Sequence, residues 1–547
     1  MQGRSSAWVW TLASLLLAAL VLRLASIRFG LPALNDPDEL MFELGALKML
    51  RGPTLNPGWF GHPATTTMYI LAIVNVGMFL TGWVAGWWDS VRAFGDIIYS
   101  NPAWIILPGR VAMTMFSIGV IFLTYRLGAR LIDRRAGILA ALLLAVSPVH
   151  ITWSQIIRSD MMACFFLLLV MNAACNIIQR NRPRDDIHAS LWLGTAIATK
   201  WPFALGIIPI AFALLALIGD GKVTWRRAIL RLGAIGGLSL VFLLLLSPYL
   251  ALDYSTVVRN LTGEGQIRHL GSTGGTAGEN ALWYIRRGLW HGLGAVAVVL
   301  MPFGLVALRK RKRAAALILP LGITFFLLFC LQTMVWERWA LPLLPLAAII
   351  SGAGGVWLVE RLPRSARPFA CVVGLIALGT PPLLSAQIDA RERLNDTRQL
   401  AAHWARKHIP AGSVILVEHF AFDLLPQPWH FLFPIGDAGC IDARALLQGK
   451  TTYGPIDQAR GTRANIDYGT MAASQRPRCR PDFAILTQYD RYRREANAFP
   501  AEYAAYRSLL ARGRVVASFD PQPGLSGGRN VTIVDFRKDV ESSERQP

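Results

Sequence analysis

The sequence has few charged residues for its length, and this shortage excludes an ordinary soluble protein. Only 16% of its 547 residues are charged and 53% are hydrophobic, whereas soluble domains are about a quarter charged. Charged residues are scarce because the chain contains repeated apolar runs of roughly 20 residues, the length that crosses a bilayer. Because lipid offers the backbone no hydrogen-bond partners, such runs must form helices. The sequence therefore predicts a polytopic α-helical membrane protein.

Acidic residues are also scarce relative to basic ones, which gives a formal net charge of +21. Binding to nucleic acid is rejected as the explanation, because much of the excess lies in short loops between apolar runs, where positive charge fixes orientation. The basic loops lie at 126–135, 180–184, 222–231, 309–313 and 361–367. We expect all of them to be cytoplasmic. The first apolar run, 7–24, has no convincing small-residue cleavage site, so we interpret it as a membrane anchor.

Eleven crossings fit between these basic loops. The expected spans are 7–27, 105–126, 136–153, 161–179, 188–199, 202–219, 233–250, 288–307, 314–333, 339–358 and 368–386. An odd number of crossings from a cytoplasmic N-terminus places the C-terminal part in the periplasm of a bacterial inner membrane. The apolar segment 64–84, in the first outer loop of about residues 28–104, is left out because counting it would invert every later basic loop. It is expected to be interfacial or re-entrant; the alternative is a true crossing paired with a missed one near 87–104.

The composition changes at about residue 387 and becomes polar and rich in proline, which divides the chain into a membrane part, 1–386, and a C-terminal domain, 387–547. Strand-like stretches alternate with helical ones in this domain, and this order predicts a small α/β fold. The strands are expected at 414–417, 483–486 and 531–534, and the helices at 397–407 and 501–512. Cys440 and Cys479 are its only cysteines, so in an oxidising compartment we expect them within disulfide range.

The motifs of most soluble enzymes are missing: the sequence has no P-loop, no zinc-ligand spacing and no nucleophile elbow. An enzyme of this kind would take its activated substrate from the membrane. The first predicted outer loop carries three carboxylates in four residues, Asp36, Asp38 and Glu39. Carboxylates crowded beside a bilayer repel one another and lose solvation, which favours a role as a base or as cation ligands. The alternative is a solvated acidic turn in which an Asp caps a helix.

Other candidate residues lie in the later outer loops. Asp160 opens an apolar run, and a carboxylate at a membrane boundary is a functional candidate; a helix cap, with Arg158 as an interfacial anchor, is the alternative. Lys200 and Arg338 are isolated cations that can bind a lipid phosphate, unless they only snorkel or anchor an aromatic belt. Arg268 and His269 lie in a glycine-rich loop that suits closure over a substrate; the alternative is that the loop is merely flexible. His62 is a lone histidine, for which a structural role is expected more than a catalytic one.

The order of these motifs resembles the GT-C superfamily of integral-membrane glycosyltransferases, and most of all the branch with protein O-mannosyltransferases and bacterial aminoarabinose transferases. The resemblance covers nearly the whole chain, with Phe42 and Ala64 as departures from the family pattern. Its elements are Asp38-Glu39, Gly61-His62-Pro63, Arg158-Ser159-Asp160, Ala198-Thr199-Lys200-Trp201 and Arg338-Trp339-Ala340-Leu341-Pro342.

This resemblance implies a GT-C catalytic module in the membrane part. It implies an inverting transferase that moves a sugar from a polyprenyl-phosphate donor to an envelope lipid, glycan or protein. Asp38 would be the base, assisted by Glu39 and Asp160. The substrate-binding residues would be Asp36, His62, Arg158, Lys200, Arg268, His269 and Arg338, with Lys200 and Arg338 on the donor phosphate. Asp38, Glu39 and Asp160 are candidate ligands for a divalent metal, because hard cations favour oxygen, although the resemblance does not require one.

Two other classes of function stay open from the sequence. A lipid or solute transporter would also be polytopic, but should show paired repeats and charges at the membrane midplane, whereas here the charges gather at one surface. A non-catalytic protein of envelope-polysaccharide assembly would not need Asp38.

Overall fold

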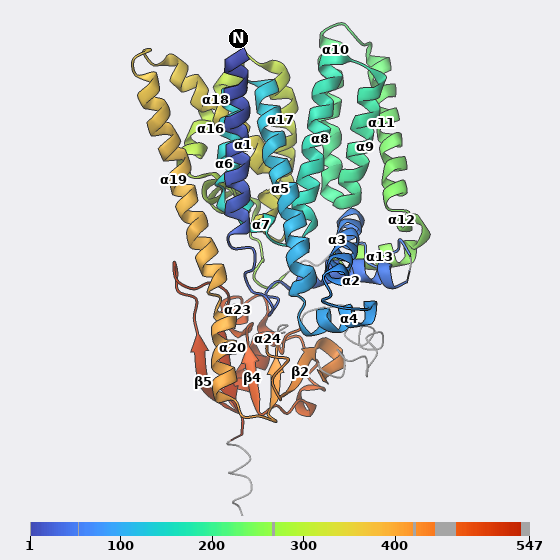
Figure 1. Ribbon diagram of the computed structural model, residues 1–547, viewed down its shortest axis with the longest axis vertical. Helices are drawn as coiled ribbons and strands as arrows, with labels where there is room; N and C mark the ends of the chain where they lie inside the picture. Colours follow the sequence, from blue (N-terminus) through green and yellow to red (C-terminus); the bar gives the residue numbers. More distant parts are fainter. Residues whose placement is uncertain (1, 53, 265–268, 419–422, 443–465, 538–547) are drawn as a thin grey trace, which may run out of the picture. The chain divides into compact units, whose positions relative to one another are not determined.

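The computed structural model describes residues 2–52, 54–264, 269–418, 423–442 and 466–537, and Figure 1 labels its helices and strands. The chain divides into two compact units. The first unit comprises residues 1–27, 41–76 and 108–387, and the second comprises 28–40, 77–107 and 388–547. The second unit therefore contains parts of the first predicted outer loop together with the whole C-terminal region.

The described elements of the first unit are helices, as the apolar runs require. Its elements are α1 (Gln2–Leu24), most of α2 (Pro37–Arg51), the first part of α3 (Thr65–Val84), most of α5 (Ala103–Leu131), α6 (Arg134–Ala145), α7 (Pro148–Ser154), α8 (Ser159–Arg180), α9 (Pro183–Thr199), η1 (Trp201–Gly206), α10 (Ile207–Gly219), α11 (Trp225–Leu246), α12 (Tyr249–Leu252), α13 (Tyr254–Glu264), α14 (Ala277–Trp283), η2 (Tyr284–Trp290), α15 (His291–Leu293), α16 (Ala295–Leu308), α17 (Lys312–Cys330), η3 (Glu337–Ala340), α18 (Leu343–Arg361) and most of α19 (Arg367–Leu394).

Nine helices in the described part of the chain are long and apolar enough to cross a bilayer, or up to eleven if each of two bent pairs is one span. The bends are 63° between α6 and α7, and 103° between the helical stretch Ala277–Leu293 and α16. The predicted polytopic membrane fold is confirmed. The 20-residue helix α3 is among the nine, which is the length that the alternative interpretation of that segment as a true crossing requires. Helix α9, where a short span was expected, has 17 residues.

Helices α8 and α18 form the interior of the first unit, where most of their side chains are buried. Helix α8 packs against α9 and α10, and α18 packs against α6 and α16 (Figure 1). Glycine permits the closest of these approaches, because a side chain at Gly304 or Gly354 would collide with a backbone oxygen of the facing helix. Small residues at a helix interface let two membrane helices pack backbone to backbone.

The second unit is built around a six-stranded sheet of order β3-β2-β1-β4-β6-β5. Strand β1 is parallel to both of its neighbours, and the outer pairs are antiparallel. The elements are α4 (Val91–Ser100), α20 (Thr397–His408), β1 (Val414–Val417), β2 (His430–Ile435), η4 (Gly436–Ala438), β3 (Gly439–Asp442), η5 (Arg476–Arg478), β4 (Phe483–Leu486), α23 (Tyr489–Arg494), α24 (Pro500–Leu510), β5 (Arg514–Phe519) and β6 (Val531–Asp535).

The predicted α/β domain is therefore confirmed, with its three expected strands as β1, β4 and β6 and its two expected helices as α20 and α24. Helix α20 packs against β5 and β6, and its alanines join a core with Ile415 and Ile533. Cys440 and Cys479 form a disulfide with a Cα–Cα distance of 5.5 Å, as predicted.

Candidate active site

Two of the short sequence motifs lie side by side in the first unit. The backbone N–H of Trp201 donates to the carbonyl of His62 at 2.9 Å, and that of Ala64 donates to Thr199 at 3.2 Å. Lys200 is extended between the end of α9 and the start of η1, so it can pair with Pro63 in a short antiparallel bridge. This pairing brings the His62 and Lys200 motifs together, although 138 residues separate them.

A buried ion pair forms the centre of the candidate site. The Nζ atom of Lys200 lies 2.5 Å from Oδ1 of Asp160, and each side chain is 7% exposed. Asp160 is held in the first turn of α8, two residues after the extended N-cap residue Arg158. Two charges that have lost their water persist only when they are paired with good geometry, so Asp160 and Lys200 fix each other's positions.

Arg338 lies against the same carboxylate. Its Nε atom is 4.0 Å from Oδ2 of Asp160, and its side chain is 8% exposed. The guanidinium also covers the ring of Trp336 at 4.0 Å. Lys200 and Arg338 therefore converge on one carboxylate from two different segments of the chain.

An indole ring lies close to both arginines of this site. The guanidinium of Arg158 is 5.7 Å, and that of Arg338 is 5.9 Å, from the ring centre of Trp153. The Nε1 atom of Trp153 donates to Glu337 at 3.0 Å. The cationic side chains of Arg158, Lys200 and Arg338 thus lie close together, and a cluster of buried cations suits an anionic ligand.

His62 contributes a neutral ring to this group. Burial lowers the pKa of His62 to about 3, and the nearby cation Lys200 acts in the same direction. Among the residues that the structure describes, none forms a hydrogen bond with its buried Nδ1 atom. The ring stacks edge-on with Trp59 at 5.0 Å. His62 can therefore donate or accept a hydrogen bond at neutral pH, but cannot supply a positive charge.

The described residues of the glycine-rich loop from 269 onward lie against the segment that leads to Arg338. Thr273 pairs with Met334, and the N–H of Gly274 donates to Thr333 at 2.8 Å. The ring of His269 lies 4.9 Å from that of Trp336. His269 and Arg338 therefore both contact the ring of Trp336. Arg268 lies outside the described residues.

The acidic residues of the first outer loop belong to the second unit. The side chain of Asp36 accepts a hydrogen bond from the N–H of Asp38 at 3.1 Å, at the start of α2. Asp36 thus takes the capping role that the structural alternative assigned to this loop. Glu39 is fully buried and Asp38 is half-buried. Of the three carboxylates, Asp38 combines partial exposure with a side chain that does not serve as this cap.

Sequence reasoning missed several residues of the candidate site. Trp153 lies five residues before Arg158, and Trp336 and Glu337 directly precede Arg338, but the sequence analysis did not select them. A further buried carboxylate of the first unit, Glu43 on α2, was also missed; it accepts from Nδ2 of Asn75 at 2.7 Å. The available signal was an acid one helical turn after Glu39 and an Asn inside an apolar run.

A metal site is not apparent in the arrangement of these side chains. In the parts of the chain with described coordinates, no group of three His, Cys, Asp or Glu side chains is placed to hold a metal ion. The ammonium of Lys200 takes the place beside Asp160 that a cation would need. The predicted metal-ligand set of Asp38, Glu39 and Asp160 therefore stays a prediction.

Comparisons with known proteins agree with this architecture. The family model for dolichyl-phosphate-mannose-protein mannosyltransferases matches residues 91–251. No curated protein sequence matches the chain. Among solved structures, ArnT from Cupriavidus metallidurans bound to undecaprenyl phosphate is similar, with a TM-score of 0.55 at 14% identity, over 97% of this chain and 98% of ArnT.

The same enzyme in its apo state gives a TM-score of 0.56 at 14% identity, with the same coverage of both chains. The archaeal oligosaccharyltransferase AglB from Archaeoglobus fulgidus, in complex with an inhibitory peptide and a dolichol-phosphate, gives 0.50 at 12% identity, over 92% of this chain and 72% of AglB. At such low identities the similarity shows the fold. The chain is a multi-pass membrane protein with the GT-C glycosyltransferase fold, as its motif order predicted.

Proposed function

We propose that this protein is an inverting glycosyltransferase of the bacterial inner membrane. It transfers a sugar from a polyprenyl-phosphate donor to an envelope lipid, glycan or protein at the periplasmic face. The observation that carries the proposal is the buried group of Lys200, Asp160 and Arg338 within a fold that resembles an enzyme bound to undecaprenyl phosphate.

The donor phosphate would bind to Lys200 and Arg338. An arginine fork matches two phosphate oxygens, and a lysine adds a point charge. Asp160 holds both cations before the donor arrives, so little reorganisation is needed on binding. The same cations stabilise the negative charge that grows on the leaving phosphate, which is the usual role of fixed charges in a dry site. The neutral ring of His62 can add a hydrogen bond.

The acceptor would be activated by Asp38. Its carboxylate takes the proton of the acceptor hydroxyl as the oxygen attacks the anomeric carbon. A new carbon–oxygen bond forms on the face opposite the phosphate, and the bond from the anomeric carbon to the phosphate oxygen breaks. Polyprenyl phosphate leaves with the electron pair, and the anomeric configuration inverts. Glu39 would orient the acceptor in this scheme.

The decisive experiment compares the intact masses of envelope lipids and glycans in cells with and without this protein. The proposal expects one class to lose the mass of a sugar when the protein is absent, and to lose it equally in an Asp38→Asn strain with normal expression. An Asp38→Asn strain with the full mass would instead support a non-catalytic assembly role. A transporter would be supported if vesicles containing the purified protein moved the lipid-linked sugar across their membrane without forming any glycosylated product.

A further inference from the structure

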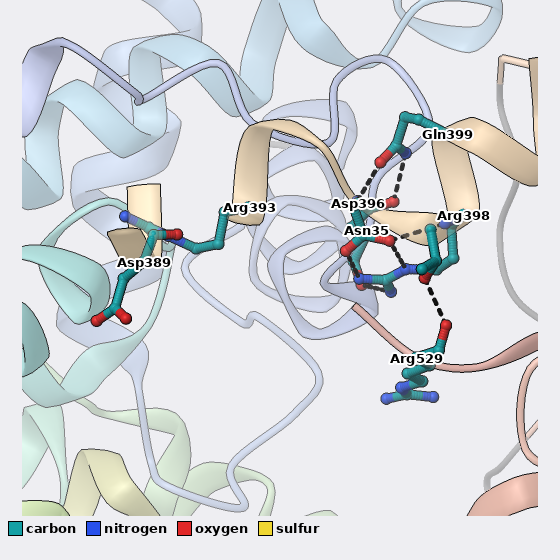
Figure 2. Close-up of polar contacts among 8 residues, drawn as sticks. Asn35, Asp389, Arg393, Asp396, Arg398, Gln399 and Arg529 are labelled. Atoms are coloured by element: carbon teal, nitrogen blue, oxygen red, sulfur yellow. Dashed lines mark hydrogen bonds and ion pairs between the residues drawn. The ribbon is translucent and has the colours of Figure 1, made fainter. Parts of the chain in front are cut away.

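The segment just before Asp38 is tied to the start of α20 by a pair of amide side chains within the second unit (Figure 2). The Nδ2 atom of Asn35 donates to Oε1 of Gln399 at 2.9 Å, and Nε2 of Gln399 donates back to Oδ1 of Asn35 at 2.8 Å. Asn35 is 9% exposed. A reciprocal pair of this kind fixes the orientation as well as the distance of the two side chains.

A third hydrogen bond holds the backbone of the same residue. Nη1 of Arg398 donates to the carbonyl of Asn35 at 2.7 Å. Arg398 is itself held by Asp396, which accepts from Nε at 2.9 Å and from Nη2 at 2.6 Å. A guanidinium fixed by a two-point carboxylate pair is already oriented for its next partner. We call Asp396, Arg398 and Gln399 the clasp; Figure 2 shows them around Asn35.

The loop that the clasp holds is folded tightly on itself. Gly30 has a φ of +65°, and a Cβ on it would lie 2.7 Å from Cγ of Asn35. The N–H of Leu34 donates to the carbonyl of Gly30 at 2.8 Å. The ring of Phe29 is covered by the guanidinium of Arg393 at 4.9 Å. The loop is thus anchored at both ends to residues of the C-terminal region.

Two residues, Asp36 and Pro37, separate Asn35 from Asp38, and the side chain of Asp36 is fixed by a hydrogen bond. Asn35 precedes Asp36, whose carboxylate caps α2 at the N–H of Asp38. Crowded carboxylates repel one another, so the acidic segment would relax without an external restraint. The clasp supplies that restraint from α20, more than 350 positions away in the sequence.

We propose that the clasp residues are positioning residues for Asp38 in the transfer reaction. The C-terminal domain is then part of the catalytic machinery, because it sets where the base lies. This inference rests on the proposed function, in which Asp38 is the base.

The test uses full-length protein in nanodiscs with a polyprenyl-phosphate sugar donor. Gln399→Glu keeps the shape of the side chain but turns an oxygen toward Oδ1 of Asn35. We expect kcat to fall roughly 10- to 100-fold, the cost of a small misplacement of reacting groups, while KM for the donor stays unchanged. Hydrogen exchange of the peptide covering residues 31–40 should become faster. Gln522→Glu is the matched control, because Gln522 is exposed and, among the residues that the structure describes, forms its hydrogen bonds through backbone atoms.

A rescue separates positioning from general stability. Asn35→Gln and Gln399→Asn should each lower kcat, whereas the two together restore the paired amides with the lengths exchanged, and should recover most of the activity. An active wild type with an equally active Gln399→Glu variant, or a folded double variant without recovery, overturns this inference alone. A wild type that forms no product from any polyprenyl-phosphate sugar overturns the proposed function and, with it, the inference.

Discussion

The Nζ atom of Lys200 lies 2.5 Å from Oδ1 of Asp160, with both side chains almost completely buried. Neither charge would be stable alone at this depth, because a buried charge that loses its partner costs about 3–5 kcal/mol. The pair is therefore a structural element of the site and, in the proposed mechanism, also its phosphate-binding element. These two roles can be separated by mutation.

Lys200→Met should both destabilise the protein and abolish use of the donor. Adding Asp160→Asn removes the second buried charge, so we expect the double variant to recover much of the thermal stability but none of the transfer. Lys222→Met is the matched control, since Lys222 forms a surface pair with Asp220 at 3.4 Å and is half-exposed. The measurements are the melting temperature in detergent and product formation at saturating donor. A double variant with wild-type transfer would show that Lys200 does not bind the phosphate.

Transfer should not depend on an added divalent metal, because Lys200 already neutralises the Asp160 carboxylate. Purified protein dialysed against EDTA should retain its initial rate of transfer, and added Mg²⁺ or Mn²⁺ should leave that rate unchanged. Loss of activity in EDTA, with recovery on adding a metal, would contradict this expectation. It would then assign Asp38, Glu39 and Asp160 the ligand role that their oxygen atoms permit.

The stability of the C-terminal domain should fall as the pH rises from about 4.5 to about 7. Burial, together with the neighbouring carboxyl of Asp467, raises the pKa of Glu418 from its ordinary value of 4.5 to about 7. The folded state then holds a proton that the unfolded state has released, so stability decreases between pH 4.5 and 7. The N–H groups of Thr487 and Gln488 donate to this carboxyl at 2.6 and 2.9 Å. Such donors favour the ionised form and oppose the rise, so burial and Asp467 outweigh them.

Limited proteolysis of the full-length protein in urea, at pH 5.5 and pH 8, measures this effect. The wild-type domain should be cleaved at lower urea concentration at pH 8. Glu418→Gln, which mimics the protonated group, should reduce the difference between the two pH values. An equal difference in both proteins would show that other groups cause it.

The membrane fold was predictable because apolar length and loop charge act locally, residue by residue. The crossing assignments were less certain where a helix is short or isolated, as with α9 and α3. In the C-terminal domain, β2 was missed because Pro434 interrupts its pattern. Strand β5 was missed because its side chains are mostly exposed or only partly buried, so hydrophobic alternation is weak.

The candidate site was predictable as a set of residues, but not as a geometry. Asp160, Lys200 and Arg338 could be selected from their motifs. The bridge between Pro63 and Lys200 depends on the path of the chain through several helices, which no local pattern contains. The amide pair of Asn35 and Gln399 could not be predicted either, because it also depends on the path of the chain and neither residue is unusual in its own segment.

The central claim is that Asp38 is the base of a sugar transfer, and the rate of Asp38→Asn measures it most directly. The asparagine keeps the shape of the side chain and removes its basicity. With purified protein and a polyprenyl-phosphate sugar donor, we predict a loss of at least about 100-fold in turnover, the lower range for a positioned acid–base group, with folding preserved. Asp96→Asn, an exposed change on α4, should transfer at the wild-type rate. Near-normal turnover by Asp38→Asn would contradict the account.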